Sequence, residues 1–472
     1  MKRLILILSY VFVSTWSLAQ DDTRVVDSLL SVMRHQEGEE KVVSMSELAR
    51  AFEEISFDDC IYYGEKSVAE AEKLKDIELI AWTHWKLGIR FMNHYEFDLA
   101  YDHFKQADQL MIVENRKVKD VELLMDILNY KGRVELLMGE LDKALTTYQR
   151  VLEVSNKLND EMNCADAINN MAYIHFHQNN LDQAMESFKE ARQKYERFQD
   201  TLSMAQCDNN ISNIYVVLQQ YDEALSLLQE VIPVFECNGD EASLAHAYQN
   251  LGTVYTIGCV NLDSALFYLN KSLVCAENVG DHITLVEDEL ELANALRFQN
   301  NEKEALRLYQ AALHSSEIMG YVNGMMESYK NLGIYYNATG DFTTSAVYLK
   351  RCMDLAAEKG NQLYVNTVRP YLIADYARLG QLMEMKKELG LVHDNYLEIV
   401  NENNILSEEL SRIQYNMEGL LDQYDSQNDQ IQTLQAQRNH YRLAFFGLLA
   451  IVLFVMVLFV AYKIVRKNRT KV

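Results

Sequence analysis

The feature that most constrains the fold of this 472-residue chain is a short segment that recurs at a nearly fixed interval. Six copies read FDLAYDHFKQA, LDKALTTYQRV, LDQAMESFKEA, YDEALSLLQEV, LDSALFYLNKS and EKEALRLYQAA. Their shared small residue is Ala100, Ala144, Ala184, Ala224, Ala265 and Ala305, at steps of 44, 40, 40, 41 and 40 residues. Two further copies place Cys60 and Ser345 forty residues outside this series. A fixed period of this size predicts a solenoid of stacked helical units.

A second segment precedes each copy and carries its own small residue. The small residues are Gly88, Gly132, Ala172, Ser212, Gly252, Ala293 and Gly333. Bulky residues such as Phe91 and Tyr255 follow three positions later. Two helices can cross closely only where a side chain is nearly absent, and the large neighbour fills the groove of the next unit. Each repeat is therefore predicted to be a helical hairpin.

This pattern resembles the tetratricopeptide repeat in its long-helix variant. The resemblance covers roughly residues 42–396, with eight copies and a degenerate ninth in YLIADYARLGQLMEMKKELG. The closing proline of the usual repeat is missing, and the whole chain has only two prolines. The resemblance implies an all-α, right-handed superhelix whose concave face, lined by the first helices, binds peptides or proteins.

Asparagines recur just before the small residue of the first helix. They are Asn129, Asn169, Asn170, Asn209, Asn210, Asn250 and Asn331. In peptide-binding members of the family, an asparagine at the corresponding place bonds the ligand backbone, to which an amide offers both a donor and an acceptor. The alternative is that these amides tie neighbouring hairpins together or face water.

Both ends of the chain carry patterns typical of targeting and membrane-anchoring segments. Residues 1–19 combine Lys2 and Arg3 with an apolar run and small residues, which predicts a secretory signal peptide followed by a lead-in helix over 20–41. Residues 443–462 carry no charge and, as a helix, reach about 30 Å, which predicts a transmembrane helix. A basic tail over 463–472 follows, with Lys463, Arg466, Lys467, Arg469 and Lys471. Positive residues stay in the cytoplasm, so we expect a single-pass membrane protein with a periplasmic body and a cytoplasmic C-terminus.

Residues 397–441 change to a heptad period. The predicted seam contains Leu406, Leu410, Ile413, Met417, Leu420, Ile431 and Leu434. Apolar residues at alternating steps of three and four predict a coiled coil, most simply a parallel homodimer. The alternative is a single long helix packed back on the solenoid.

Composition and motifs narrow the function. The net charge is −25, and residues 20–441 carry 36 Lys and Arg against 69 Asp and Glu, a surface that repels nucleic acid. No phosphate-binding glycine loop, HExxH zinc motif or nucleophile elbow occurs, so we expect no enzyme, no cofactor and no metal. Seven cysteines without regular spacing do not form a disulfide framework.

The order of segments resembles the extracytoplasmic half of bacterial tetratricopeptide-repeat membrane sensors, without their cytoplasmic output domain. That resemblance implies a membrane-anchored protein- or peptide-binding module, a sensory or adaptor subunit that signals through a separate partner. The alternatives are a static envelope scaffold or assembly factor, and a truncated signalling protein that lacks its kinase or helix-turn-helix output.

Overall fold

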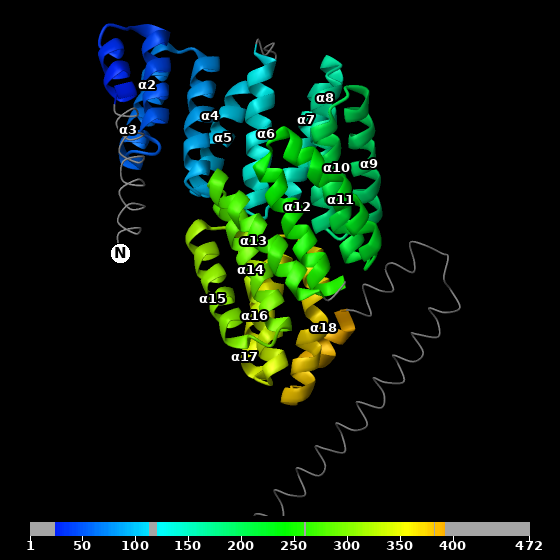
Figure 1. Cartoon of the computed structure of the whole chain (residues 1–472). Coiled ribbons are helices and arrows are strands. Elements are labelled where there is room, and N and C mark those ends of the chain that lie inside the picture. Colours follow the sequence, from blue (N-terminus) through cyan, green and yellow to red (C-terminus); the bar gives the residue numbers. More distant parts are fainter. Residues whose placement is uncertain (1–23, 113–119, 259–260, 382, 392–472) are drawn as a thin grey trace, which may run out of the picture. The chain divides into compact units, whose positions relative to one another are not determined.

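A computed structural model describes residues 24–112, 120–258, 261–381 and 383–391 as a succession of antiparallel α-helices (Figure 1). The helical hairpins are α2 (Gly38–Phe52) with α3 (Phe57–Leu74), α4 (Ile77–Asn93) with α5 (Phe97–Met111), α6 (Val121–Leu137) with α7 (Leu141–Leu158), α8 (Glu161–His177) with α9 (Leu181–Arg197), α10 (Thr201–Val217) with α11 (Tyr221–Asn238), α12 (Glu241–Thr253) with α13 (Leu262–Val279), α14 (His282–Phe298) with α15 (Glu302–Met319), and α16 (Val322–Thr339) with α17 (Phe342–Glu358). A one-turn π-helix, η1 (Val254–Gly258), continues α12, and α18 (Gln362–Leu379) follows the last hairpin. Even-numbered helices are thus the first of each pair, and odd-numbered ones the second.

Small residues allow the two helices of a hairpin to approach. A Cβ added at Gly132 would lie 2.7 Å from the ring carbon Cζ of Tyr148 on α7, and one at Gly88 would lie 2.7 Å from Cε1 of Phe104 on α5. On the second helices the recurrent alanines are fully buried, at Ala100, Ala144, Ala184, Ala224, Ala265 and Ala305. A larger side chain at any of these crossings would force the helices apart, at a typical cost of about 1–3 kcal/mol.

An acidic cap starts most of the first helices. Asp76, Asp120, Asp160, Asp200, Asp240 and Asp281 each accept a hydrogen bond from a backbone N–H in the first turn. Asn361 does the same for α18. Such caps satisfy otherwise unpaired backbone donors and fix where each helix begins. Tyr321, at the corresponding position before α16, makes no cap bond through its side chain.

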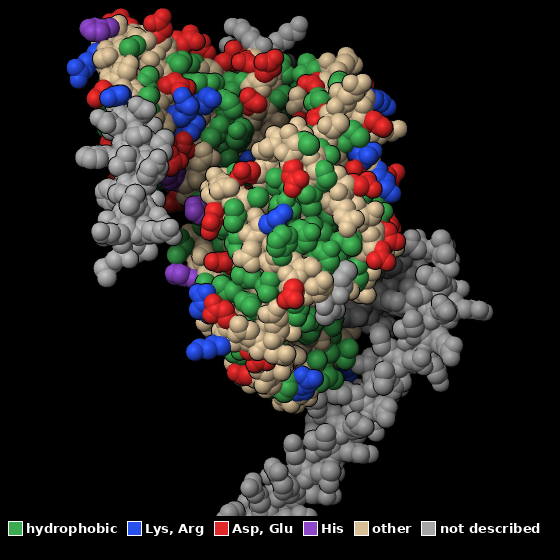
Figure 2. All heavy atoms as spheres, viewed as in Figure 1, with side chains coloured by type: hydrophobic (Ala, Val, Ile, Leu, Met, Phe, Trp, Pro, Cys, Tyr) green, Lys and Arg blue, Asp and Glu red, His purple; other side chains and the backbone are tan. Residues whose placement is uncertain are grey.

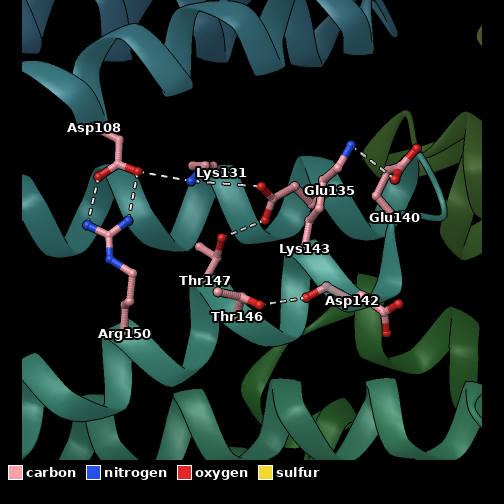
Figure 3. A network of polar contacts seen from close by, with 9 residues as sticks. All are labelled: Asp108, Lys131, Glu135, Glu140, Asp142, Lys143, Thr146, Thr147 and Arg150. Atoms are coloured by element: carbon pink, nitrogen blue, oxygen red, sulfur yellow. Dashed lines mark hydrogen bonds and ion pairs between the residues drawn. The ribbon is translucent and has the colours of Figure 1, made fainter.

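A network of buried charges joins α5, α6 and α7 (Figure 3). Asp108 accepts hydrogen bonds from Lys131 at 2.9 Å and from both terminal nitrogens of Arg150 at 2.8 and 2.9 Å. Beside it, the buried Glu135 accepts a 2.7 Å bond from the hydroxyl of Thr147. Burial raises the pKa of Asp108, but the bonds from Arg150 and Lys131 outweigh this effect and hold that pKa below its ordinary value.

Turns that are far apart in sequence meet where the superhelix comes round on itself. Lys359, after α17, donates a 2.7 Å bond to Glu140, before α7, across 219 residues. A Cβ at Gly139, whose φ is +70°, would lie 2.9 Å from Cγ1 of Val322. Helix α18 also packs against α8. We call the Glu140–Lys359 and Gly139–Val322 pairs the closing contacts, because they bring the first helices of distant repeats to face one another.

Charged and hydrophobic side chains are distributed unevenly over the outer surface. Figure 2 shows acidic and basic side chains scattered over the visible face, with hydrophobic ones gathered over α13 in the middle of the view. Phe267 and Val274 on α13 are 56% and 55% exposed. The described cysteines, Cys60, Cys164, Cys207, Cys237, Cys275 and Cys352, are free thiols.

The fold class requires one correction. The sequence predicts a solenoid that ends in a transmembrane helix, yet across the described ranges no helix is both long and apolar enough to cross a membrane. The physical reason is visible in α9, LDQAMESFKEARQKYER, where charged residues of the outer face interrupt the apolar ones. The fold supported for the described residues is an all-α helical-repeat solenoid, in which no helix could span a membrane.

Several predictions fall outside the described residues. They concern the signal peptide 1–19, the coiled coil 397–441 with its seam, the span 443–462 and the basic tail 463–472. The export of the body, its location and the homodimer through the coiled coil therefore stay predictions.

Candidate functional site

Two adjoining pockets open on the inner face of the solenoid, and almost all of their walls come from first helices. The pocket of about 480 Å³, here called the asparagine pocket, is lined from α6, α8, α10, α12, α14 and α16. The pocket of about 320 Å³, here called the acidic pocket, is lined from α8, α10, α12, α14, α16 and α18. The pockets share Tyr173, Asn213, Gln249, Asn250, Glu287, Tyr321 and Asn323. Because these seven lining residues are common, the pockets adjoin, and we call the two together the inner groove.

Four of the predicted asparagines line the asparagine pocket. They are Asn170, Asn209, Asn210 and Asn250, and the structure adds Asn213, one helical turn beyond Asn210 on α10. Asn250 donates a 3.1 Å bond to Asn209, so one amide pair links α12 to α10 while it lines the groove. At this pair the amides tie two hairpins together and also border the groove, and their contact with a ligand stays a prediction.

The other three predicted asparagines do not line either pocket. Asn169 accepts a 3.4 Å contact from the thiol of Cys207, which links α8 to α10. Asn331 donates a 3.1 Å bond to Glu327 within α16. Asn129 on α6 is half-buried, and its carbonyl oxygen has no partner within the described structure. Their position in the repeat is the expected one, yet these three side chains are not part of the groove wall.

Three carboxyl groups and one cationic side chain meet among the described residues that line the acidic pocket. Glu287 and Glu291 lie one turn apart on α14, and Glu327 lies on α16. Lys330 forms a 2.6 Å ion pair with Glu327 from the same helix. The pairing leaves the two carboxyl groups of α14 without a cation of their own in this pocket.

The pKa values of these three carboxyl groups reflect the presence of a single lysine among them. Burial, together with the charge of Glu327, raises the pKa of Glu291 to about 7. Burial also raises the pKa of Glu287. Burial acts in the same direction on Glu327, but the charge and hydrogen bond of Lys330 outweigh it and lower that pKa. A carboxyl with a raised pKa inside a cleft marks a position where a charge is poorly compensated.

Tyr321 stands where the neighbouring repeats have a capping aspartate. Its hydroxyl donates to Glu287 across the junction of the two pockets. The side chain is buried, and burial raises its pKa well above the ordinary value, so it stays a neutral donor. Where the other repeats have a capping aspartate, Tyr321 thus forms part of the groove wall at the start of α16. An alignment of the repeats at this position would have revealed Tyr321 from the sequence.

Two buried polar side chains of the acidic pocket have unpartnered atoms. Asn323 is 9% exposed, and its carbonyl oxygen has no hydrogen-bond partner within the described structure. His177 is 9% exposed, and the same holds for both of its ring nitrogens. Burial lowers the pKa of His177 to about 4, so the ring is neutral at physiological pH. The repeat pattern of the sequence singles out neither His177 nor Asn323.

Metal binding has no evident place in the described part of the chain. Across its ranges, no group of three or more His, Cys, Asp or Glu is arranged so that it could hold a metal ion.

A family model of a known repeat matches part of the chain. Residues 123–197 match the family model described as tetratricopeptide repeat. No sequence in a search of curated proteins matches the chain significantly.

Several solved structures are similar to the chain at low identity. The Rap conjugation gene regulator of the plasmid pLS20, in complex with the Phr* peptide, is 12% identical with a TM-score of 0.54, over 72% of this chain and 95% of that one. Aspartyl phosphate phosphatase F from Bacillus subtilis is 16% identical with a TM-score of 0.49, over 70% and 92%. NprR in complex with its cognate peptide NprX is 14% identical with a TM-score of 0.47, over 69% and 98%. At these identities the likeness is one of fold alone.

Proposed function

We propose that this chain is a peptide-binding module whose ligand lies along the inner groove. The observation that carries the proposal is that two adjoining pockets of several hundred Å³ share lining residues from successive first helices. Volumes in this range suit small ligands and short peptide segments. The solved regulator of similar fold is in complex with a peptide, which is consistent with this use of the fold.

The amides of α10 and α12 suit a ligand with a peptide backbone. Asn210, Asn213 and Gln249 are half-buried and line the groove, and each amide offers a donor and an acceptor at once. An extended backbone presents the same two functions at every residue, whatever its side chains. The groove can therefore hold a peptide by its backbone and select it by what enters the acidic pocket.

A sensory or adaptor role is part of the same proposal. The groove is bounded by repeats that the closing contacts hold together, so a ligand that binds one arrangement better than another would shift the balance between arrangements. A partner protein that binds one of these arrangements preferentially would respond to that shift.

The experiment is affinity selection with the full chain. Mixed hexapeptide libraries are passed over the immobilised protein, and retained peptides are identified by mass spectrometry. We expect enrichment of a peptide subset, with affinity about fivefold lower for Asn210→Ala, as for the loss of about 1 kcal/mol of hydrogen bonding.

The matched control is Asn270→Ala. Asn270 is exposed on α13 and donates a 2.6 Å bond to the backbone of Leu266 within its own helix. The Asn270→Ala variant should bind the selected peptides with unchanged affinity. Retention of no peptide, or equal affinity in the Asn210 and Asn270 variants, would refute the proposal.

A further inference from the structure

The acidic pocket carries a charge imbalance that a ligand could correct. Glu287 and Glu291 project from α14 into the pocket, while its cation, Lys330, is bonded to Glu327 at 2.6 Å. The side chains of Lys330 and Glu327 are only 19% and 20% exposed, so this pair is held away from bulk water. Lys330 is therefore taken up by Glu327, and the two carboxyl groups of α14, although Glu287 accepts from Tyr321, have no ion pair among the described residues of this pocket.

A second observation points to the same space. The carbonyl oxygen of Asn323 is an acceptor without a donor, in a side chain that is more than nine-tenths buried and lines both pockets. An unsatisfied buried polar atom costs about 1–3 kcal/mol, so such atoms in a folded protein usually await a partner. The missing partner of an acceptor is an N–H or O–H donor.

The aromatic walls add a third element. Tyr173, Phe176 and Tyr364 line the acidic pocket beside His177, and the rings of Tyr173 and His177 meet edge to face at 4.4 Å. Aromatic faces attract cations, and they also cover the methylene stem of a long basic side chain. The ammonium of Lys330 already lies 5.5 Å from the ring centroid of Tyr364, which shows that the pocket accommodates a cation next to an aromatic ring.

We propose that the acidic pocket binds a cationic group of the peptide in the inner groove, an ammonium or guanidinium that is held by Glu291 and Glu287 and donates to Asn323. This inference rests on the proposed function and names the chemistry that the groove selects. The group is supplied either by a lysine or arginine side chain or by the free amine at the start of a peptide. An acidic ligand is disfavoured, because its carboxylate would meet two carboxyl groups before it reached Lys330.

The test uses four acetylated hexapeptide libraries that differ at one scanned position. That position is fixed as lysine, arginine, norleucine or glutamate, and each library is selected on the full chain. The best lysine peptide is then resynthesised with each replacement, and its Kd is measured by fluorescence anisotropy at constant ionic strength. We expect lysine or arginine to bind at least about tenfold more tightly than norleucine at one defined position, as for a hydrogen-bonded charge pair. A parallel set with free amines separates a side chain from a peptide terminus as the source of the cation.

The variants are Glu291→Gln and Glu289→Gln. Glu291→Gln should reduce the preference for lysine over norleucine to less than about threefold, since one of two carboxylates is neutralised. Glu289 lies on the same helix but lines neither pocket, so its variant should keep the full preference.

The outcomes separate the inference from the proposed function. Peptides that bind without a preference for a basic residue, or with one for glutamate, overturn the inference and leave the peptide-binding proposal standing. A preference that survives Glu291→Gln unchanged also overturns it, because the cation then sits elsewhere. Retention of no peptide from any library defeats both.

Discussion

The described solenoid contains two clusters of buried carboxyl groups, and they differ in how their charges are paired. Around Asp108, two cations converge on one carboxylate, and Thr147 donates to the neighbouring Glu135 (Figure 3). Around Glu291, three carboxyl groups share one lysine. The first cluster lies between the helices of successive hairpins, whereas the second lines the inner groove.

The difference shows which cluster serves the fold. A buried charge is tolerated when its hydrogen bonds and counter-charges are complete, as they are for Asp108. The raised pKa of Glu291 shows that its environment disfavours the charged form. Stability alone gives no reason for such an arrangement, and strained or poorly compensated groups are typical of binding sites.

The largest expected effect comes from breaking the paired cluster. Asp108→Ala leaves Lys131 and Arg150 without their shared carboxylate, and we expect it to lower the free energy of unfolding by about 3 kcal/mol. Urea denaturation followed by circular dichroism measures the loss, and hydrogen exchange localises it to α5, α6 and α7. Asp98→Ala, an exposed position on the same helix, is the control and should cost no more than about 0.5 kcal/mol. Equal costs at the two sites would show that the network does not support the fold.

The sequence predicts the periodic part of this molecule well. The hairpins, and the small residues that line their crossings, follow from a spacing that repeats every 40 or so residues. Packing of this kind is local, since Gly132 meets Tyr148 only 16 positions later. A periodic pattern therefore carries most of the information about which helices pair.

The groove could be predicted only in part. Asn170, Asn210 and Asn250 lie on its wall, as their repeat position suggested, but the same rule also selects Asn129 and Asn331, which do not. The acidic pocket combines α8 with α14, α16 and α18, and that meeting depends on how far the superhelix turns per repeat. Small rotations add up over several repeats, so no single repeat encodes the result.

The second prediction tests the uncompensated cluster through its pH dependence. The pKa of Glu291 is about 7 when the protein is folded, above its ordinary value of 4.5. Between those values the folded chain binds more protons than the unfolded chain, so this group makes the protein less stable as the pH rises. Glu291→Gln removes that loss, and its stability relative to the native chain should improve by roughly 1–3 kcal/mol between pH 4.5 and pH 8.

Urea denaturation at both pH values measures this change. Glu302→Gln, at an exposed position on α15, is the control and should show no such trend. The groups that face Glu291 in the pocket are the same in both proteins: Tyr173 and His177 from α8, Glu287 from α14, Tyr321 before α16, Glu327 and Lys330 from α16, and Tyr364 from α18. A variant that is less stable than the native chain at pH 8 would mean that the carboxylate is already paired, and the contrast between the clusters would disappear.

The smallest effect on stability is expected at the closing contacts. We expect these contacts to hold together the distant repeats that line the acidic pocket. Glu140 accepts one ion pair from Lys359 at 2.7 Å, across the superhelix, and another from Lys143 at 3.1 Å, within the first turn of α7. Lys359 is 15% exposed and Lys143 is 54% exposed, so water screens the second pair far more than the first. The two lysines thus provide matched substitutions on one carboxylate.

Double-mutant cycles of Lys359→Met and Lys143→Met with Glu140→Gln separate the two interactions. We expect a coupling free energy of about 0.5–1 kcal/mol for Lys359 and about 0.3 kcal/mol or less for Lys143. Lys359→Met should also speed hydrogen exchange at the turns around Gly139 and Val322, and lower peptide affinity a few-fold, because α8 and α18, which pack together, both supply wall of the acidic pocket. Lys143→Met removes a bond to the same carboxylate without loosening that wall. Equal coupling for the two lysines, with unchanged exchange at both turns, would mean that the groove keeps its shape without this contact, and that the charge imbalance around Glu291 arises within the α14 and α16 repeats themselves.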